Sequence, residues 1–472
     1  SFILAGEKQK HSNPCRFYRL THEQEKYRNH EDKIEGLAKV TKSNRDGTVH
    51  GDVYVVDQEA FLEIERTPIV YWFGSEILEY FLDETSERIP EPKKGLSTGN
   101  DERFLRKWWE VPRSAIGKKY DWMMTSGDDD TYYTSSEKVV LWEDGGHAVK
   151  NASGSHTRGE SAYKMPGLTC RKFGSEFTAR KHPPDHIFAE SAYFIPESTG
   201  SDSNSMMGCL CSSFIRYIMN GLNPSMHFNT SAISSLPLPP EIQKHPEIDA
   251  LVERAIELQK TRFSLNEVKR EFSNVANLSE KLVNHHYEEE LLLAEVEIIR
   301  GIIDDIVFST LDLTLPVEEK IYNTFGNRLR EEPIIGQTDS LSELCSSYII
   351  KDVIDTSKEE VLAEQSVSTE SKSIIEVAEK VGHSPLTVAN IKQKYDIYSS
   401  DELVDSAGRL LSYYLGCILG RHNKIEGVGT TEDGILPFGE TYEEHVHDKI
   451  KDCFTQCFQQ PNRVESKLEE ML

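Results

Sequence analysis

Residues 93–111 form the stretch of this sequence whose residue types could do the most specific chemistry. Two glycines bracket a Ser-Thr pair, and glycine's access to positive φ lets a backbone approach a large ligand closely. The flanking cations could neutralise phosphates, and the hydroxyl and amide side chains could bond to base edges or sugars. An ordinary strand-to-loop turn with surface cations is the plain alternative. The side chains concerned are Lys93, Lys94, Gly95, Ser97, Thr98, Gly99, Asn100, Arg103, Arg106 and Lys107.

The charge of the chain is unevenly distributed. Its 472 residues include 53 Lys and Arg against 79 Asp and Glu, a formal net charge of −26. Residues 88–181 nevertheless hold 17 Lys and Arg against 13 Asp and Glu, a balance of +4, which leaves −30 for the rest. A local positive field allows an acidic protein to bind nucleic acid without adhering to every polyanion. A domain that is simply less acidic would give the same contrast, so charge alone leaves both interpretations open.

Side chains that could hold a metal are poorly spaced for that purpose. Cys209 with Cys211, and Cys453 with Cys457, have no cysteine or histidine partners at zinc-ligand spacing. We expect these to be reduced thiols of a cytosolic protein. The His285–His286 pair stands beside three glutamates and favours a solvated charged face. We therefore predict no metal site.

The elements that position these residues follow from the spacing of apolar side chains. Residues 88–180 combine short strands, glycine turns and many aromatic side chains, whereas the chain beyond residues 234–240 (SSLPLPP) is mostly helical. The most apolar stretch, residues 291–307, contains five charged residues and cannot cross a bilayer. We predict extended runs at residues 2–4, 16–20, 53–56 and 139–142, and helices at residues 76–82, 206–221, 251–263, 282–307, 318–325, 403–419 and 443–458.

Residues 373–395 have the pattern of a helix–turn–helix, with Gly382 in the turn and Pro385 at the first position of the second helix. A DNA-binding unit of this kind would read bases from its second helix. Glu376 and Glu379 on the first helix favour a packing hairpin instead. The side chains available to DNA would be Thr387, Asn390, Lys392 and Lys394.

Six segments of the sequence occur in an order that is more specific than any one of them. Gly95–Val111 reads G-x-S-T-G-x-D-x-x-F-L-R-x-W-x-E-V, and Leu222–Pro237 begins with LNP. In this order they resemble the target-recognising, C-terminal half of the adenine-specific DNA methyltransferases of BREX and Pgl phage-defence systems (PglX-like), relatives of the methyltransferases with a TaqI-type specificity domain. The remaining segments are Lys164–Thr169, Phe177–Arg180, Ser412–Arg421 and Asp433–Pro437.

The resemblance implies an α+β fold with five parts. A small remnant of an α/β methyltransferase sheet would come first, followed by a mixed strand-and-loop recognition domain and a mostly α-helical C-terminal region. The predicted parts are residues 1–85 (end of the methyltransferase domain and connector), 86–240 (DNA target recognition), 241–354 (helical domain), 355–400 (acidic insertion with the hairpin) and 401–472 (C-terminal helices).

The motifs that the family uses for catalysis are missing here. Such enzymes hold S-adenosylmethionine with a Gly-containing loop and grip the extruded adenine with an Asn/Asp-Pro-Pro-Tyr/Phe motif. Residues 13–15 (NPC) and 182–185 (HPPD) depart from that motif. We therefore expect no catalytic residue and no cofactor site in this chain, with S-adenosylmethionine bound in a catalytic half outside it. Whether the chain acts as an enzyme stays open.

The resemblance also implies a function, which is DNA target recognition for adenine-N6 methylation. The expected partners are double-stranded DNA, a methyltransferase catalytic domain in cis or in trans, and other defence-system proteins in the cytoplasm. Ser97, Thr98, Asn100 and Asn151 would supply base discrimination, at about 1–3 kcal/mol for each good contact. Besides the cations named above, phosphate contacts would come from Lys164, Arg171 and Arg180.

Two other functions fit the same residues. A free-standing specificity subunit could bind DNA and dock onto a separate methyltransferase or nuclease. An acidic, mostly helical interaction protein would have no DNA role at all. Salt dependence separates the last from the others, because phosphate contacts make affinity fall as salt rises.

Overall fold

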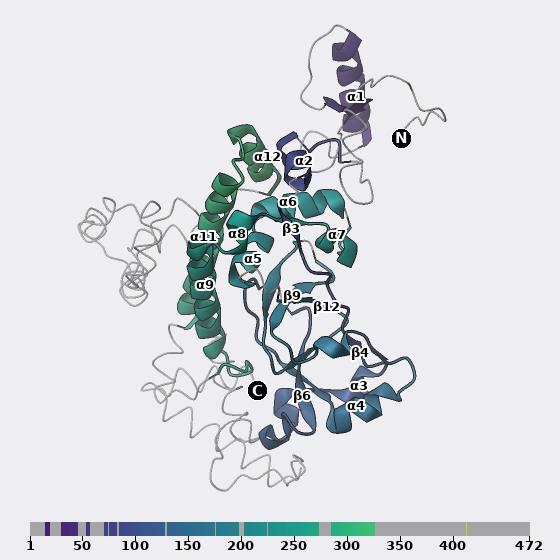
Figure 1. The fold of residues 1–472 in the computed structure, drawn as a ribbon, viewed down its shortest axis with the longest axis vertical. Helices are drawn as coiled ribbons and strands as arrows, with labels where there is room; N and C mark the ends of the chain where they lie inside the picture. The colour runs from purple at the N-terminus through teal and green to yellow at the C-terminus, as the bar shows by residue number, and fades with distance from the viewer. Residues whose placement is uncertain are drawn as a thin grey trace, which may run out of the picture.

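The computed structural model describes most residues between 70 and 325, together with a few short segments outside that range. The strands of the two larger sheets lie together on one side, and the two longest helices run side by side on the other (Figure 1). The described residues are 15–18, 30–45, 53–56, 70–73, 75–82, 85–127, 130–174, 176–197, 203–223, 225–272, 285–325 and 412.

The first described elements are a small antiparallel ribbon and two helices. Strand β1 (Cys15–Tyr18) pairs with β2 (Val53–Val56), and α1 (His30–Arg45) lies between them in the chain. Helix α2 (Ser75–Leu82) follows. The extended runs predicted near residues 16–20 and 53–56 and the helix predicted at 76–82 are confirmed, while the run at 2–4 lies outside the described residues. The origin of this part as the end of a methyltransferase sheet stays a prediction.

A three-stranded antiparallel sheet forms the centre of the strand region. Its order is β10-β9-β12, and the middle strand is buried on both faces over residues 167–170, with helix α5 (Ser203–Leu210) packed against it. Buried side chains such as Leu168 and Tyr193 join the main apolar core from this sheet. The strands are β9 (Gly167–Arg171), β10 (Ala179–His182) and β12 (Ala192–Pro196).

A second sheet of four strands lies beside it, in the order β11-β6-β7-β5. The pair β11–β6 is parallel and the other two pairs are antiparallel. Its apolar faces pack in smaller clusters of their own, around Val140 and around Trp108. The strands are β5 (Leu105–Lys107), β6 (Tyr120–Met124), β7 (Lys138–Leu141) and β11 (His186–Phe188).

Two further strand pairs connect distant parts of the chain. Strand β4 (Leu96–Ser97) pairs with β8 (His156–Thr157), which brings the predicted turn beside a later loop. Strand β3 (Glu87–Arg88) pairs with β13 (Pro237–Leu238). Arg88 strengthens this second pair, since its guanidinium donates to the carbonyls of Ser235 (2.9 Å) and Phe81 (3.0 Å).

The predicted helix at residues 206–221 is wrong in one respect, because the structure contains two helices there. Helix α5 ends at Leu210 and α6 runs from Ser213 to Leu222. Ser212 caps the second helix by accepting from the Ile215 amide at 3.3 Å. The Ser213 amide, left without a helical partner at this break, donates to the Asp304 carboxylate at 2.7 Å.

The predicted helices at 251–263, 282–307 and 318–325 are confirmed. They pack on the same apolar core as the central sheet; at Gly208 of α5 an added Cβ would lie 2.4 Å from Ile248. The core thus continues across residue 240. The domain boundary predicted there stays a prediction. The elements after β12 are α7 (Thr230–Ser234), α8 (Pro240–Gln243), α9 (Pro246–Ser264), α11 (His285–Thr310) and α12 (Leu315–Phe325).

Several predictions fall on parts that the structure does not describe. They are the hairpin at residues 373–395, the helices at 403–419 and 443–458, and the Cys453–Cys457 pair. Among the described cysteines, Cys170, Cys209 and Cys211 are buried free thiols. None of the described helices has the length and apolar character needed to span a membrane.

Candidate nucleic-acid interface

The two glycines of the predicted turn approach this chain's own backbone. A Cβ on Gly95 would lie 2.2 Å from the Phe188 carbonyl oxygen, so β4 can lie against that segment only with glycine there. Gly99 has φ +69° and sits against Ser153, whose carbonyl oxygen would be 2.6 Å from an added Cβ. Their special geometry is therefore explained by packing, which corrects the expectation that it serves a ligand.

The polar side chains of the turn divide into buried and exposed ones. Thr98 is only 2% exposed and donates its hydroxyl proton to Asp101, so we withdraw it from the residues expected to read bases. Asn100 is exposed, but its Oδ1 accepts from the Arg103 amide at 3.0 Å and caps helix α3 (Asp101–Phe104). Ser97 is half-buried. The turn is thus held mainly by its own polar groups.

Arg180 does not belong to the surface at all. It is 2% exposed, and its guanidinium donates to the backbone carbonyls of Asp130 (2.7 Å) and Ser126. Both carbonyls belong to the segment before β7, which Arg180 ties to β10. We therefore withdraw Arg180 from the predicted phosphate contacts, because a buried cation already satisfied by carbonyls cannot reach DNA.

Three other predicted cations are engaged within the fold but remain partly accessible. Lys107 contacts Glu137 at 2.6 Å, and Lys164 contacts Asp121 at 2.6 Å. Arg106 donates to the carbonyl of Glu102 at 2.7 Å. Asp121 is 6% exposed, so Lys164 neutralises a buried carboxylate and is held there. The partners of Lys107 and Arg106 are more accessible, and contacts of that kind contribute little to stability, so these two cations can exchange partners when a polyanion is present.

The remaining predicted residues lie at the surface. Lys93 and Lys94 are exposed, and no ion pair is found for either within the described part of the chain. Arg103 is exposed, with its guanidinium carbon 4.9 Å from the centre of the Phe104 ring. Asn151 is exposed at the end of helix α4 (Glu143–Lys150), in the turn that contacts Gly99. The structure therefore brings Lys93–Asn100 and the loop around Asn151 together.

A cluster around Glu190 extends this surface and was missed from the sequence. Glu190 contacts Lys172 at 3.2 Å and Arg158 at 3.4 Å, and its amide donates to the Leu96 carbonyl at 2.8 Å. The hydrogen bond from Lys172 lowers the pKa of the Glu190 carboxyl. Glu190 thus joins the β4–β8 pair to the end of β9, where the predicted Arg171 lies beside Gly174.

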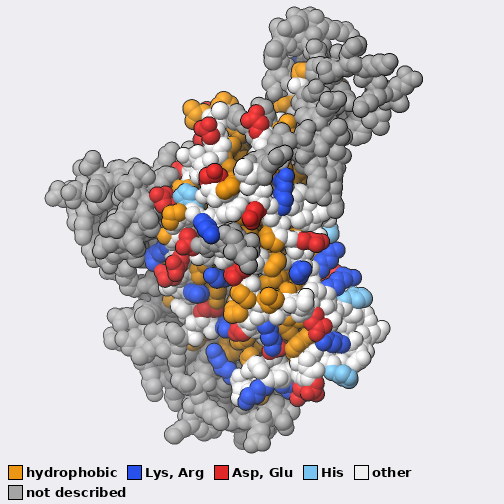
Figure 2. All heavy atoms as spheres, in the orientation of Figure 1, with side chains coloured by type: hydrophobic (Ala, Val, Ile, Leu, Met, Phe, Trp, Pro, Cys, Tyr) orange, Lys and Arg blue, Asp and Glu red, His pale blue; other side chains and the backbone are white. Residues whose placement is uncertain are grey.

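The space-filling view shows the charge on one face of this surface. Lys and Arg side chains are frequent over the lower part, where Figure 1 places β4, α3 and α4, and acidic side chains are interspersed among them (Figure 2). The surface is therefore mixed in charge.

The HPPD segment does not provide a grip for adenine. The Asp185 carboxylate is occupied by His186 Nδ1 (2.7 Å) and by the Arg270 guanidinium (2.9 Å). His182 is buried, with Nε2 3.1 Å from the His186 carbonyl oxygen, and burial lowers its pKa to about 4. These residues hold the fold together, and they do not fit the acceptor set that an extruded adenine would need.

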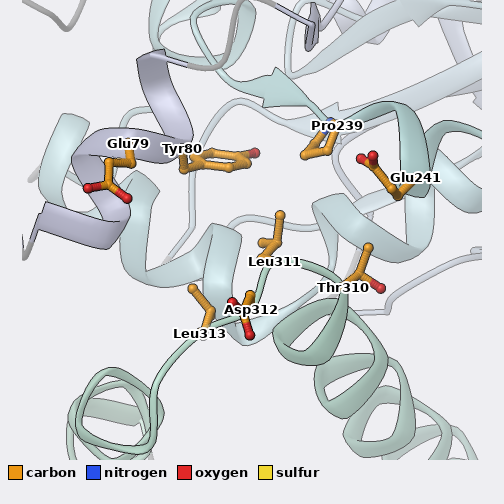
Figure 3. A pocket seen from close by; sticks show the side chains of 8 residues that line it. All are labelled: Glu79, Tyr80, Pro239, Glu241, Thr310, Leu311, Asp312 and Leu313. Atoms are coloured by element: carbon orange, nitrogen blue, oxygen red, sulfur yellow. The ribbon is translucent and has the colours of Figure 1, made fainter.

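A pocket of about 340 Å³ lies on another part of the molecule, between α2, α8 and the α11–α12 turn. Glu79, Glu241 and Asp312 place carboxylates around it, with Tyr80 and Leu311 between them (Figure 3). Its negative rim makes it unsuitable for a polyanion. Within the described residues, no group of His, Cys, Asp and Glu side chains is arranged to hold a metal ion.

Comparison with solved structures gives a weak match. The type IIL restriction-modification enzyme MmeI in complex with DNA matches 55% of this chain and 36% of its own, with 13% identity and a TM-score of 0.30. At that TM-score the likeness carries no argument about function. No protein-family model matches the chain.

Comparison with curated proteins gives two relatives. The adenine-specific methyltransferase BrxX of Escherichia coli O9:H4 (strain HS) is 23% identical over 406 residues, which cover 83% of this chain and 29% of BrxX. The adenine-specific methyltransferase PglX of Lacticaseibacillus casei (strain Zhang) is 25% identical over 268 residues, 50% of this chain and 21% of PglX. The chain spans less than a third of either relative's length. The order of its motifs and these two matches agree, and the chain is related to the BREX/Pgl-type adenine-specific methyltransferases.

Proposed function

We propose that this chain recognises the DNA target of an adenine-N6 methyltransferase of the phage-defence type. Methyl transfer itself would take place in a catalytic part that this chain does not contain. The relationship to BrxX and PglX supports the choice of reaction. The departures of this sequence from the cofactor loop and from the adenine-gripping motif support the assignment of methyl transfer to another part.

The observation that carries the proposal is the position of the exposed cations. Lys93 and Lys94 stand where the segment before β4 bridges β12, since the Lys93 amide donates to the Phe194 carbonyl at 2.7 Å. Lys172 and Arg158 reach the same surface through Glu190. Side chains from three distant segments thus form one cationic surface on a chain of net charge −26.

In this function the cations set the register of the protein on the duplex through phosphate contacts, which carry no sequence information. Exposed polar side chains of the adjoining loops, Asn151 and Ser97 among them, then contact base edges. Extruding an adenine costs a few kcal/mol, and the contacts made by this chain would offset part of that cost. S-adenosylmethionine would supply the methyl group in the catalytic part.

The test removes Lys93 and Lys94 together. We expect Lys93→Gln/Lys94→Gln to bind mixed-sequence duplex DNA about tenfold more weakly, and to reduce the slope of log affinity against log salt by about 2. Lys244→Gln/Lys260→Gln is the matched control, because both lysines are exposed on the α8–α9 side. Equal losses in the two double variants, or a wild-type affinity that ignores salt, would rule the proposal out.

A further inference from the structure

Two large apolar side chains are exposed beside the cationic surface. Phe173 is 52% exposed and Met226 is 67% exposed. An aromatic ring left in water can gain apolar contact when a partner covers it. Burying a phenylalanine or methionine side chain of this size contributes about 1.5–3 kcal/mol.

These side chains belong to a short two-stranded ribbon, which we call the ribbon tip and define as residues 172–174 and 226–228. Its two halves are hydrogen-bonded as an antiparallel pair: the Gly174 amide donates to the Met226 carbonyl (3.0 Å), and the Phe228 amide donates to the Lys172 carbonyl (2.9 Å). Phe173 and His227 are directly opposite one another, and their rings stack with centroids 4.8 Å apart. Met226 pairs with Gly174, at the neighbouring position.

The ribbon tip is held rigidly from below. Asn223 is 4% exposed, and its Nδ2 donates to the carbonyls of His227 (2.8 Å) and Ser225 (3.0 Å). Its Oδ1 accepts from the amide and the side chain of Asn229. Phe228 is buried against Phe177. The tip therefore presents its exposed side chains in a fixed conformation, so little ordering entropy remains to be lost on binding.

The charges around the ribbon tip favour a polyanion as the partner. Lys172 lies 5.3 Å from the centre of the Phe173 ring and shares Glu190 with Arg158. Two cations thus share one carboxylate next to an aromatic ring, and Arg171 lies beside Gly174 of the same ribbon. An apolar side chain flanked by cations is the combination with which proteins insert a wedge between base pairs.

We propose that Phe173, supported by the stacked His227 ring, enters the base stack of the bound duplex and unstacks one step. Lys172 and Arg158 contact the adjacent phosphates. This inference rests on the proposed function, since it assumes that the same surface binds DNA. It adds a contact that distorts the duplex at the place where the target base must leave the stack.

The experiment measures unstacking and binding separately. The 472-residue chain is titrated into mixed-sequence duplexes in which 2-aminopurine replaces some of the adenines, because 2-aminopurine fluoresces more strongly when it is unstacked. We expect wild-type protein to raise the fluorescence at least twofold. Phe173→Ala should abolish this rise and weaken binding about tenfold, with an unchanged salt slope, whereas Phe173→Trp should restore the rise.

Leu315→Ala is the matched control, because Leu315 is 72% exposed at the start of α12, away from the ribbon tip. It should leave both fluorescence and affinity unchanged, and the melting temperature of Phe173→Ala should equal that of wild type. If the wild type binds DNA in a salt-dependent manner without a rise, or if Phe173→Ala keeps the rise, the wedge is wrong and the proposed function stands. If the wild type does not bind DNA at all, both fail.

Discussion

The cations between residues 88 and 181 divide into two sets that differ in what faces them. Arg180 is enclosed by backbone carbonyls of its own fold, whereas Lys93 and Lys94 are exposed to solvent. Lys172 and Arg158 lie between these extremes, because they share the Glu190 carboxylate at the surface. The comparison teaches that the excess of Lys and Arg counted in the sequence is larger than the excess exposed at the surface, because some of these cations bind groups inside the fold.

The set that serves the fold also includes Arg270, a half-buried cation outside residues 88–181, whose contacts join the helical region to the four-stranded sheet. Arg270, which follows α9, donates to Asp185 and lies 3.2 Å from His186 Nε2. Its guanidinium carbon is 4.8 Å from the centre of the Trp122 ring, which is itself stacked with His186. Changes in this set should affect folding, and changes in the exposed set should affect binding.

The largest effect is expected at Arg180. Arg180→Met should lower the free energy of unfolding by about 3 kcal/mol, because buried carbonyls would lose their donors. Urea denaturation measures this change. Arg158→Met makes the same chemical change at an exposed site and should alter stability by less than about 0.5 kcal/mol. Similar losses in both variants would erase the distinction between the two sets.

A smaller effect is expected from acid, through His182 and His186. Burial lowers the pKa of both imidazoles, that of His182 to about 4. Folding therefore favours the neutral forms of the two imidazoles. Their contribution to the free energy of unfolding is complete above about pH 6.5, which is the pKa of histidine in an unfolded chain. The contribution is lost as the pH falls toward about 4. The loss should reach about 1–3 kcal/mol.

Unfolding by urea at a series of pH values checks this expectation. His182→Gln removes one of the two titrating groups, so its stability should depend less steeply on pH than that of the wild type. Parallel curves for the two proteins across that range would show that the buried histidine does not contribute.

The smallest effect is expected at Glu190. Glu190→Gln removes the carboxylate that Lys172 and Arg158 share, so both cations would face phosphate without a competing partner. We expect duplex DNA to bind about threefold more tightly. The corresponding change in the free energy of binding is less than about 1 kcal/mol, because exposed ion pairs contribute little. Glu257→Gln on α9 changes the net charge equally and should leave affinity unchanged. Tighter binding in both variants would indicate a general charge effect.

The sequence predicted what depends on local pattern. The apolar spacing of residues 251–263 and 282–307 indicated α9 and α11, because a helix buries its face at a fixed period. The break at Ser212 escaped prediction, since one of the partners that stabilise it, Asp304, is distant in the chain. The resemblance to the BREX/Pgl-type adenine-specific methyltransferases was likewise confirmed by the relatives, whereas the domain boundaries stay predictions.

The candidate surface was predicted only in part, for a similar reason. Gly95 and Gly99 were singled out as positions where the backbone approaches a ligand closely, whereas the structure places this chain's own backbone against both of them. Arg180 could not be separated from the exposed cations, because its partners at Ser126 and Asp130 are about fifty positions earlier. Phe173 gave no signal of its own, since its partner across the ribbon tip, His227, is distant in the chain.

The pairing of β3 with β13 has a consequence for how the molecule unfolds. Glu87 lies opposite Leu238, so the two ends of the segment between them meet in one strand pair. Side chains of this segment, Leu168 and Phe214 among them, share the main apolar core with α9 and α11. The strand region and these helices therefore form one cooperative unit, and the loss of either would expose the apolar face of the other.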